Sequence, residues 1–224
     1  MNGEDFEKKR RELIKRLIRE GILRDKKVIK AMLAVPREEF VPANYRSFAY
    51  NDTPLPIGYG QTISAPHMVA IMTQALNPDP GDKVLEVGTG SGYQAAILAE
   101  IVGDSGHVWT IERVKELVEF ARSNLGRLSY LRRVTVIHGD GSLGYSPAAP
   151  YDKIMITAAT PEVPEPLLEQ LKVGGRLVAP VGDRYLQRLV IITKESDGKI
   201  RREYSIPCVF VPLVGRYGFK YDEF

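Results

Sequence analysis

Cysteine is almost absent from this sequence, which has a single one, Cys208, among its 224 residues. One cysteine cannot form an intramolecular disulfide, and without a C-x-x-C pair a structural zinc site lacks its usual ligands. The three histidines stand far apart in the chain, so we expect no metal. There is also no run of about 18 apolar residues and no apolar leader, so we expect neither a membrane-spanning helix nor a signal peptide. These absences predict a cytoplasmic protein with no membrane partner.

A surplus of positive charge is missing from most of the chain. Residues 1–30 carry 11 Lys and Arg against 6 Asp and Glu, whereas the remaining residues carry 20 against 22. A nucleic-acid-binding protein usually collects positive charge around its binding site and not in one terminal extension. We therefore interpret the basic residues as the exposed face of a helix and expect no nucleic-acid partner.

Three segments of different character make up what we interpret as one domain, residues 1–224. Apolar residues spaced three and four apart predict two amphipathic helices within residues 1–35, the second with an N-cap at Asp25. Residues 36–66 contain five prolines and show neither helical nor alternating periodicity, which predicts a long ordered loop. Long connections of this kind are usually functional, so we expect this one to contact a substrate. Residues 67–224 form the core of the domain.

The core alternates between β-branched runs and helical stretches. Crossover helices between successive strands imply parallel pairing, so the predicted fold class is a doubly wound α/β core with a mostly parallel sheet. The last two strands are separated only by the turn Ser196-Asp197-Gly198 and therefore form an antiparallel C-terminal hairpin. The expected strands are 83–87, 107–111, 133–138, 153–157, 176–181, 189–193 and 204–211, and the expected helices are 65–76, 93–102, 113–125 and 164–171.

The strongest chemical signal is a glycine-rich turn after the first of these strands. Residues 84–87 are apolar apart from Glu86 and run into the sequence GTGSG at 88–92. Glycines at the carboxyl end of a strand let a ligand approach the backbone closely. A dinucleotide fingerprint has the spacing G-x-G-x-x-G, whereas this turn is G-x-G-x-G, and Glu86 would repel a pyrophosphate. The same carboxylate would attract an ammonium group, so the pattern favours S-adenosylmethionine over a nicotinamide dinucleotide.

Two further acidic residues follow the next two strands. Glu112 lies 24 residues beyond Gly88, where an acidic side chain can accept hydrogen bonds from both ribose hydroxyls. Asp140, in the run HGDG at 138–141, follows the third strand and is placed to accept a hydrogen bond from an adenine amino group. Either acid alone is commonly a capping or loop residue. Three acids at successive strand ends, together with the glycine turn, predict a nucleotide site.

A second cluster, residues 60–68, joins the proline-rich segment to the helix that follows. Ser64 is placed to cap that helix, which is a common structural role for a serine. His67 is three residues further on, so a nucleophilic serine and histidine pair has to be considered. No G-x-S-x-G elbow is present in the chain, and we therefore reject hydrolysis.

These motifs resemble the protein-L-isoaspartate (D-aspartate) O-methyltransferase family over nearly the whole chain. The string TISAPHM at 62–68 is specific to that family among methyltransferases, whereas the glycine turn alone indicates only the S-adenosylmethionine-dependent superfamily. The other segments that carry the resemblance are VPREEFVP at 35–42, AY at 49–50, PLPIG at 54–58, GDG at 139–141, LKVGGRL at 171–177 and FVPL at 210–213.

The resemblance implies a class I, Rossmann-like methyltransferase fold and a protein repair reaction. A methyl group passes from S-adenosylmethionine, leaving S-adenosylhomocysteine, to the free α-carboxylate of an L-isoaspartyl residue, with D-aspartyl residues as a further candidate substrate. The methyl ester then closes to a succinimide, whose hydrolysis returns some normal aspartate. Isoaspartyl proteins and peptides are the implied partners, and we expect a monomer.

The resemblance also implies which residues form the site. Ser64 matches the catalytic position of the family. The segment after Leu213 contacts the substrate peptide in the family, but it varies among members, so none of its residues is assigned. No residue is assigned to a metal. The residues that we assign to the cofactor are Ile63, His67, Glu86, Gly88, Thr89, Gly90, Gly92, Glu112, Asp140 and Gly141.

One alternative stays open, which is an S-adenosylmethionine-dependent methyltransferase acting on a small-molecule acceptor, because the core fold is shared. Such an enzyme would not need the proline-rich segment. Enzymes that methylate nucleic-acid amines resemble one another in an Asp/Asn-Pro-Pro-aromatic motif after the fourth strand, where this chain has TAAT at 157–160. A binding module without catalysis is disfavoured because Ser64 and its neighbours are intact.

Overall fold

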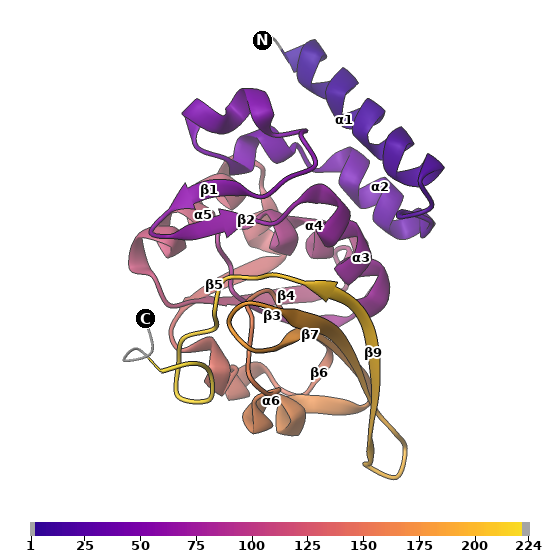
Figure 1. The fold of residues 1–224 in the computed structure, drawn as a ribbon, viewed down its shortest axis with the longest axis vertical. Helices are drawn as coiled ribbons and strands as arrows, with labels where there is room; N and C mark the ends of the chain where they lie inside the picture. Colours follow the sequence, from indigo (N-terminus) through magenta and orange to yellow (C-terminus); the bar gives the residue numbers. More distant parts are fainter. Residues whose placement is uncertain (1–2, 221–224) are drawn as a thin grey trace.

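A mixed seven-stranded sheet forms the centre of the molecule and separates helices packed on its two faces (Figure 1). The computed structural model describes residues 3–220. The strand order is β5-β4-β3-β6-β7-β8-β9, in which the first five strands are parallel and β8 and β9 are each antiparallel to the preceding strand. The predicted doubly wound core with an antiparallel C-terminal hairpin is confirmed. The strands are β3 (Lys83–Val87), β4 (His107–Glu112), β5 (Val134–His138), β6 (Tyr151–Ile156), β7 (Leu171–Gly182), β8 (Gln187–Lys194) and β9 (Ile200–Cys208).

Two hydrophobic clusters, one on each face of the sheet, hold the layers together. Successive strand residues point to opposite faces, so Val84 packs with α3, α4 and α5 whereas Leu85 packs with α6. In Figure 1 α3 and α4 lie above the sheet and α6 lies below it. The helices of the core are α3 (Pro66–Leu76), α4 (Tyr93–Val102), α5 (Lys115–Arg127) and α6 (Glu165–Gln170), with short 3₁₀ turns η3 (Tyr130–Arg132), η4 (Gly141–Leu143) and η5 (Ser146–Ala148).

The N-terminal extension is helical, as predicted, and α2 packs between α1 and α4. The two helices are α1 (Gly3–Arg19) and α2 (Lys26–Ala34). The predicted N-cap is confirmed, because the Asp25 carboxylate accepts hydrogen bonds from the backbone N–H groups of Lys27 (2.7 Å) and Val28 (3.2 Å). Residues 3–220 contain no helix that combines the length and the apolar character needed to cross a membrane.

The prediction of a long loop without regular structure over residues 36–66 is wrong. This segment contains η1 (Arg37–Phe40), η2 (Ala43–Phe48) and an antiparallel hairpin of β1 (Leu55–Gly58) and β2 (Gln61–Ile63). Tyr59 and Gly60 form the hairpin turn, and both have positive φ angles (55° and 70°), which is typical of two-residue turns. Strands of four and three residues are too short to show alternation in the sequence.

The limits of the other elements agree with the sequence to within a few residues in most cases. Those of β3 and α4 match the predicted ranges 83–87 and 93–102. The larger differences lie in β7, which begins directly after α6 at Leu171, and in β9, which begins at Ile200. Because parallel strands end at the same edge of a sheet, the loops after β3, β4 and β6 meet there and can form a ligand site.

Candidate active site

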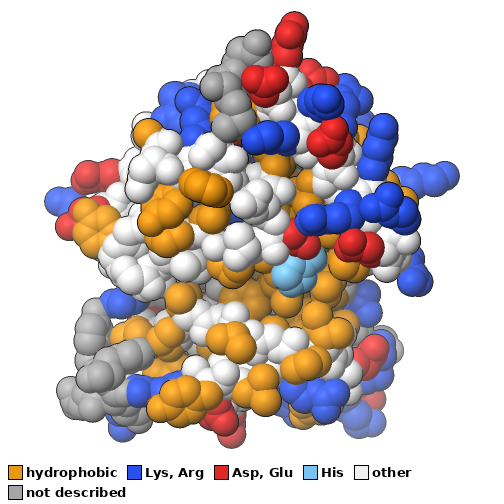
Figure 2. Space-filling model, turned by 45° about the horizontal axis from the view of Figure 1, so that its top comes forward, with side chains coloured by type: hydrophobic (Ala, Val, Ile, Leu, Met, Phe, Trp, Pro, Cys, Tyr) orange, Lys and Arg blue, Asp and Glu red, His pale blue; other side chains and the backbone are white. Residues whose placement is uncertain are grey.

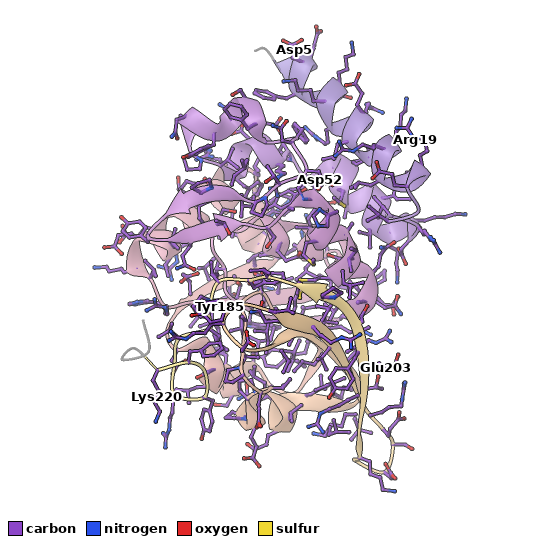
Figure 3. The ribbon with its side chains drawn as sticks, in the orientation of Figure 1. Asp5, Arg19, Asp52, Tyr185, Glu203 and Lys220 are labelled. Carbon is purple, nitrogen blue, oxygen red and sulfur yellow. The ribbon has the colours of Figure 1, made fainter. Side chains whose placement is uncertain are left out.

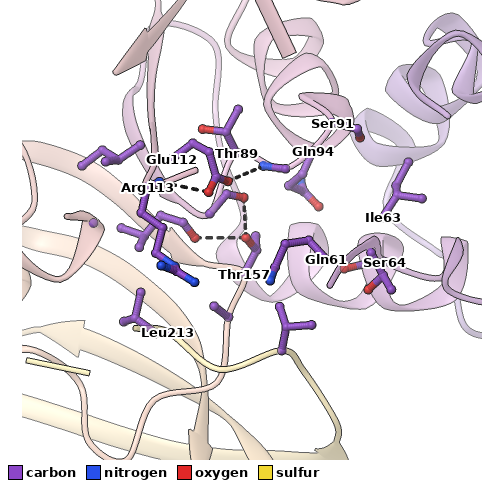
Figure 4. A pocket seen from close by; sticks show the side chains of 18 of the residues that line it. Gln61, Ile63, Ser64, Thr89, Ser91, Gln94, Glu112, Arg113, Thr157 and Leu213 are labelled. Atoms are coloured by element: carbon purple, nitrogen blue, oxygen red, sulfur yellow. Dashed lines mark hydrogen bonds between the residues drawn. The ribbon is translucent and has the colours of Figure 1, made fainter. Parts of the chain in front are cut away.

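A pocket opens at the carboxyl edge of β3, β4 and β6 and encloses about 860 Å³ of empty space, its open mouth included. The glycine turn and Glu112 lie on one side, Gln61 and Ser64 lie across from them, and residues 211–214 add a third wall (Figure 4). Figure 2 shows the molecule hollowed across its middle, with hydrophobic side chains gathered along the hollow. A pocket of this size suits a nucleoside-sized ligand. Seven of the eleven predicted site residues line it, namely Ile63, Ser64, Gly88, Thr89, Gly90, Glu112 and Gly141.

At the glycine turn the backbone itself lines the pocket, because the glycines have no side chains. Gly88 and Gly90 have positive φ angles of 99° and 53°, and a Cβ on Gly88 would collide with the Thr157 hydroxyl. Gly92, which we predicted as a cofactor contact, does not line the pocket. It caps α4 with a φ of 87°, and a Cβ there would lie 3.1 Å from Cγ of Leu125 on α5. Gly92 therefore serves the packing of two helices.

Backbone N–H groups fix the Glu112 carboxylate at the end of β4. Its Oε1 accepts hydrogen bonds from Arg113 (2.9 Å) and Val114 (3.0 Å), and its Oε2 accepts one from Gly90 (2.9 Å). A carboxylate has about four lone-pair sites, so Oε2 can accept one further hydrogen bond. Glu112 can therefore accept a hydrogen bond from one ribose hydroxyl of S-adenosylmethionine, whereas the sequence predicted hydrogen bonds from both.

Thr157, directly after β6, is a pocket residue that sequence reasoning missed. Its Oγ1 lies 2.7 Å from the Gly88 carbonyl oxygen and 3.0 Å from that of Val87 (Figure 4). A single hydroxyl hydrogen cannot satisfy both carbonyls fully, so acceptor capacity remains beside the glycine turn. Carbonyl oxygens suit an ammonium group. The position after the fourth strand was the one signal available in the sequence.

Glu86 does not line the pocket, contrary to its predicted contact with an ammonium group. Its side chain is fully buried on β3, where Oε2 accepts a 2.5 Å hydrogen bond from Thr110 Oγ1 and Oε1 has no partner among residues 3–220. Burial raises the pKa of Glu86 to about 8, a shift that the Thr110 hydrogen bond opposes and the Glu112 charge increases. The carboxyl group lies behind the glycine turn.

His67 is also outside the pocket lining, because the first turn of α3 directs it elsewhere. Its backbone N–H donates to Asp52 Oδ1 (2.8 Å), and its Nδ1 lies 3.0 Å from the same oxygen. Figure 3 shows Asp52 between α1 and α3. Residues two apart on a helix face nearly opposite sides. Val69 therefore lines the pocket, whereas we predicted that His67 does.

Asp140 supports the pocket from outside. Its Oδ1 accepts hydrogen bonds from the backbone N–H (2.9 Å) and hydroxyl (2.7 Å) of Ser142, and its Oδ2 accepts one from the Arg216 N–H (2.8 Å). These partners use most of its acceptor capacity. Asp140 thus fixes the turn that presents Gly141, whereas we predicted a contact with adenine.

Ser64 lines the pocket just beyond β2 and does not cap α3, so the predicted N-cap is wrong. Pro66 opens the helix, and the residue before a proline takes an extended conformation, which makes Ala65 the N-cap (φ −56°, ψ 144°). Within residues 3–220 the Ser64 hydroxyl has no hydrogen-bond partner. It is therefore available to a ligand.

The third wall comes from the end of the chain. Ala159, after β6, donates a hydrogen bond from its N–H to the Val211 carbonyl (2.8 Å) and accepts one from the Leu213 N–H (2.7 Å). These bonds hold residues 211–214 across the pocket. The part of the chain that the structure describes shows no group of three or more His, Cys, Asp or Glu side chains placed to hold a metal ion.

The fold and the pocket together define a class of enzyme. A Rossmann-like sheet with a G-x-G-x-G turn after its first strand and an acidic residue ending the second is the arrangement of S-adenosylmethionine-dependent methyltransferases. A family model described as Protein-L-isoaspartate(D-aspartate) O-methyltransferase matches residues 8–218. The chain therefore belongs to the protein-L-isoaspartate(D-aspartate) O-methyltransferase family.

Relatives and solved structures agree with this membership. The protein-L-isoaspartate O-methyltransferase of Staphylothermus marinus is 59% identical over 96% of this chain and 98% of that protein, and that of Hyperthermus butylicus is 59% identical over 97% and 93%. A solved protein-L-isoaspartate O-methyltransferase has a TM-score of 0.84 at 32% identity, covering 93% of this chain and 67% of that one. A Plasmodium falciparum structure named for the same activity, in complex with S-adenosyl-L-homocysteine, has a TM-score of 0.81 at 32% identity, covering 91% and 97%.

Proposed function

We propose that this chain methylates the free α-carboxylate of L-isoaspartyl residues in damaged proteins, with S-adenosylmethionine as the methyl donor. The observation that supports this most directly is the Ser64 hydroxyl, which has no hydrogen-bond partner within the described residues and lines the same pocket as the glycine turn and Glu112. A free hydroxyl beside a nucleotide site can orient an acceptor group there. Family membership supports the choice of an isoaspartyl acceptor.

The chemistry of the walls suggests where each part of the cofactor binds. The glycine turn and Thr157 would hold its amino acid end, where the Gly88 carbonyl could accept a hydrogen bond from the ammonium group. Glu112 would hold its ribose, and Ile111 and Gly141 would lie beside its adenine. Bound there, S-adenosylmethionine supplies an electrophilic methyl group on a sulfonium. The remaining predicted contacts that line the pocket are Ile63, Thr89 and Gly90.

The acceptor needs no general base, because a free carboxyl group has a reference pKa of about 3 to 4 and is ionised at neutral pH. One carboxylate oxygen bonds to the methyl carbon while the carbon–sulfur bond breaks and its electron pair stays on sulfur. Ser64 donates a hydrogen bond that orients the carboxylate, and the apolar wall at 211–214 excludes water. Because opposite charges cancel in this step, a lysine beside the carboxylate would slow it.

Methyl transfer to two synthetic peptides that differ only in isoaspartate or aspartate at one position tests the proposal. We expect a base-labile methyl ester on the isoaspartyl peptide alone. Ser64→Ala should lower the rate by roughly tenfold or more, the effect of losing a hydrogen bond to a charged group, while cofactor affinity measured by calorimetry stays within about twofold. Ser64→Thr keeps the hydroxyl and is the matched control.

The contrary result is equally clear. If neither peptide is labelled while the cofactor still binds, the isoaspartyl substrate is wrong and small-molecule acceptors become the leading alternative. A third peptide with D-aspartate at the same position tests the further substrate that we propose. The monomeric state, the cytoplasmic location and a single domain over residues 1–224 also stay predictions.

A further inference from the structure

We propose that Glu86 is an uncharged carboxylic acid in the folded protein and acts as a positioning residue that ties the glycine turn to β4 through the hydroxyl groups of Thr110 and Thr89. This role replaces the direct contact with an ammonium group that the sequence suggested. The inference rests on the proposed function in one respect, namely that the glycine turn holds the cofactor.

A chain of hydrogen bonds joins the three side chains. Thr89 Oγ1 lies 2.7 Å from Thr110 Oγ1, and Thr110 donates to Glu86 Oε2 at 2.5 Å. Glu86 on β3 and Thr110 on β4 are direct neighbours in the parallel register, and Thr89 lies within the turn. Their exposed fractions are 0%, 0% and 3%. One buried connection therefore links two strands to the segment that lines the pocket.

The number of hydroxyl hydrogens fixes which group donates in each of these hydrogen bonds. Thr110 has one hydroxyl hydrogen and donates it to Glu86, so the hydrogen between the two threonines comes from Thr89. The Thr89 hydroxyl is therefore held from behind the turn. Gly90, the next residue, is held separately by its N–H bond to Glu112. Adjacent residues of the turn are thus fixed by two different acids.

The surroundings of Glu86 favour its uncharged form. It is fully buried, its Oε1 lacks a partner in the described part of the chain, and the charged group acting on it is the Glu112 carboxylate, which has the same sign. Burying an ionised carboxylate with a single hydrogen bond is strongly unfavourable. A proton on Oε1 removes the charge and leaves Oε2 free to accept from Thr110. The raised pKa of about 8 agrees with this state.

Titratable groups on the covering helices are engaged elsewhere. Helices α3, α4 and α5 cover this face of the sheet, and the titratable residues of α3 and α4 are His67, Tyr93 and Glu100. The charged residues of α5 are all exposed, namely Lys115, Glu116, Glu119, Arg122 and Arg127. His67 contacts Asp52, Tyr93 lies under the Arg37 guanidinium with 5.0 Å between its ring centre and Cζ, and Glu100 pairs with Arg133. Across β6, Met155 is the register partner of Glu86.

The first test asks whether cofactor binding depends on a negative charge at Glu86 or on its hydrogen bond to Thr110. It uses calorimetric titration with S-adenosylhomocysteine. Glu86→Gln keeps a neutral acceptor of the same shape, so its Kd should stay within about twofold of the wild type. Glu86→Ala and Thr110→Val interrupt this series of hydrogen bonds and should raise the Kd about fivefold, as expected for a lost hydrogen bond. Thr110→Ser keeps the hydroxyl and should rescue the affinity. A tenfold loss in Glu86→Gln would overturn the proposal, because the negative charge would then be what binds.

The second test needs no cofactor and is independent of the proposed function. Between about pH 5 and pH 8 the unfolded chain loses the Glu86 proton while the folded protein keeps it, so the free energy of unfolding falls as the pH rises. Urea unfolding should therefore show the wild type losing stability relative to Glu86→Gln across this range. A constant difference would mean that Glu86 is ionised in the folded protein, which would overturn the inference and leave the methyl transfer proposal untouched.

Discussion

The two acids beside the glycine turn differ in the donors that surround their oxygens. Glu112 accepts three bonds from backbone N–H groups, whose direction the chain fixes, whereas Glu86 accepts one from a threonine hydroxyl. A hydroxyl can rotate and act as donor or acceptor, but an N–H group can only donate. We therefore expect the same substitution by glutamine to be tolerated at position 86 and harmful at position 112.

Glu112→Gln should weaken S-adenosylhomocysteine binding roughly tenfold and lower the free energy of unfolding by about 1–3 kcal/mol, because a side-chain NH₂ group would face backbone donors. Calorimetric titration and urea unfolding measure the two effects. Glu116→Gln, on the exposed face of α5, removes the same charge and is the matched control. Equal effects of the two variants would show that charge, and not hydrogen-bond geometry, is what matters.

The sequence could predict only part of the site from motif positions, because Asp140 follows a strand as Glu112 does and yet lies outside the pocket lining. Ser64 and Glu112 were found because each stands at a motif position beside a predicted element. His67 was misplaced because a string of neighbouring residues does not reveal which side of a helix meets the pocket, and Val69 is that side. Thr157 was missed because a threonine after a strand carries no distinctive signal.

The contact between α4 and α5 depends on the absence of a side chain at Gly92. Gly92→Ala should cost about 3 kcal/mol of unfolding free energy, since it combines a positive φ with overpacking against Leu125. Gly198, in the turn between β8 and β9, has a φ of 80°, and a Cβ added there would meet nothing within 4 Å, so Gly198→Ala should cost only about 1 kcal/mol. Urea unfolding of both variants measures the difference, and equal losses would contradict the packing role.

Element prediction succeeded where periodicity extends over enough residues. The strand β3 and the helix α4 matched their predicted ranges because a buried apolar strand and a long apolar helix are bounded by glycine-rich turns. The hairpin of β1 and β2 was missed because Pro56 and Gly58 interrupt its few residues, and its turn depends on the positive φ of Tyr59, which a sequence does not show. Backbone pairing between β1 and β2 stabilises that hairpin, whereas the strand propensity of the individual residues does not predict it.

At the scale of the whole molecule, a buried polar network attaches α1 to the rest of the fold. The Arg10 guanidinium donates to the Tyr50 hydroxyl and to the Leu33 carbonyl, both at 2.9 Å, and forms an ion pair with Glu38 at 3.4 Å. Tyr50 in turn donates to Glu38, which is nearly fully buried. A buried carboxylate without its cation is costly, so Arg10 carries much of this attachment.

Arg10→Met should lower the free energy of unfolding by about 3 kcal/mol, because it strands the Glu38 carboxylate in the interior. Arg11, the next residue, pairs with Glu7 on the exposed face of α1, and Arg11→Met should leave the stability almost unchanged because solvent screens this pair. Chemical unfolding of the two variants provides the comparison. Small and equal losses would show that apolar packing alone holds α1 in place.

The Asp52 carboxylate contacts both the N-terminal extension and a helix that lines the pocket. Its Oδ1 binds the first turn of α3 at His67, and its Oδ2 lies 3.6 Å from the Arg16 guanidinium on α1. The same helix α3 presents Val69 and Met72 to the pocket. One carboxylate therefore faces both α3, which lines the pocket, and α1, so the N-terminal extension lies within a single side chain of the pocket wall.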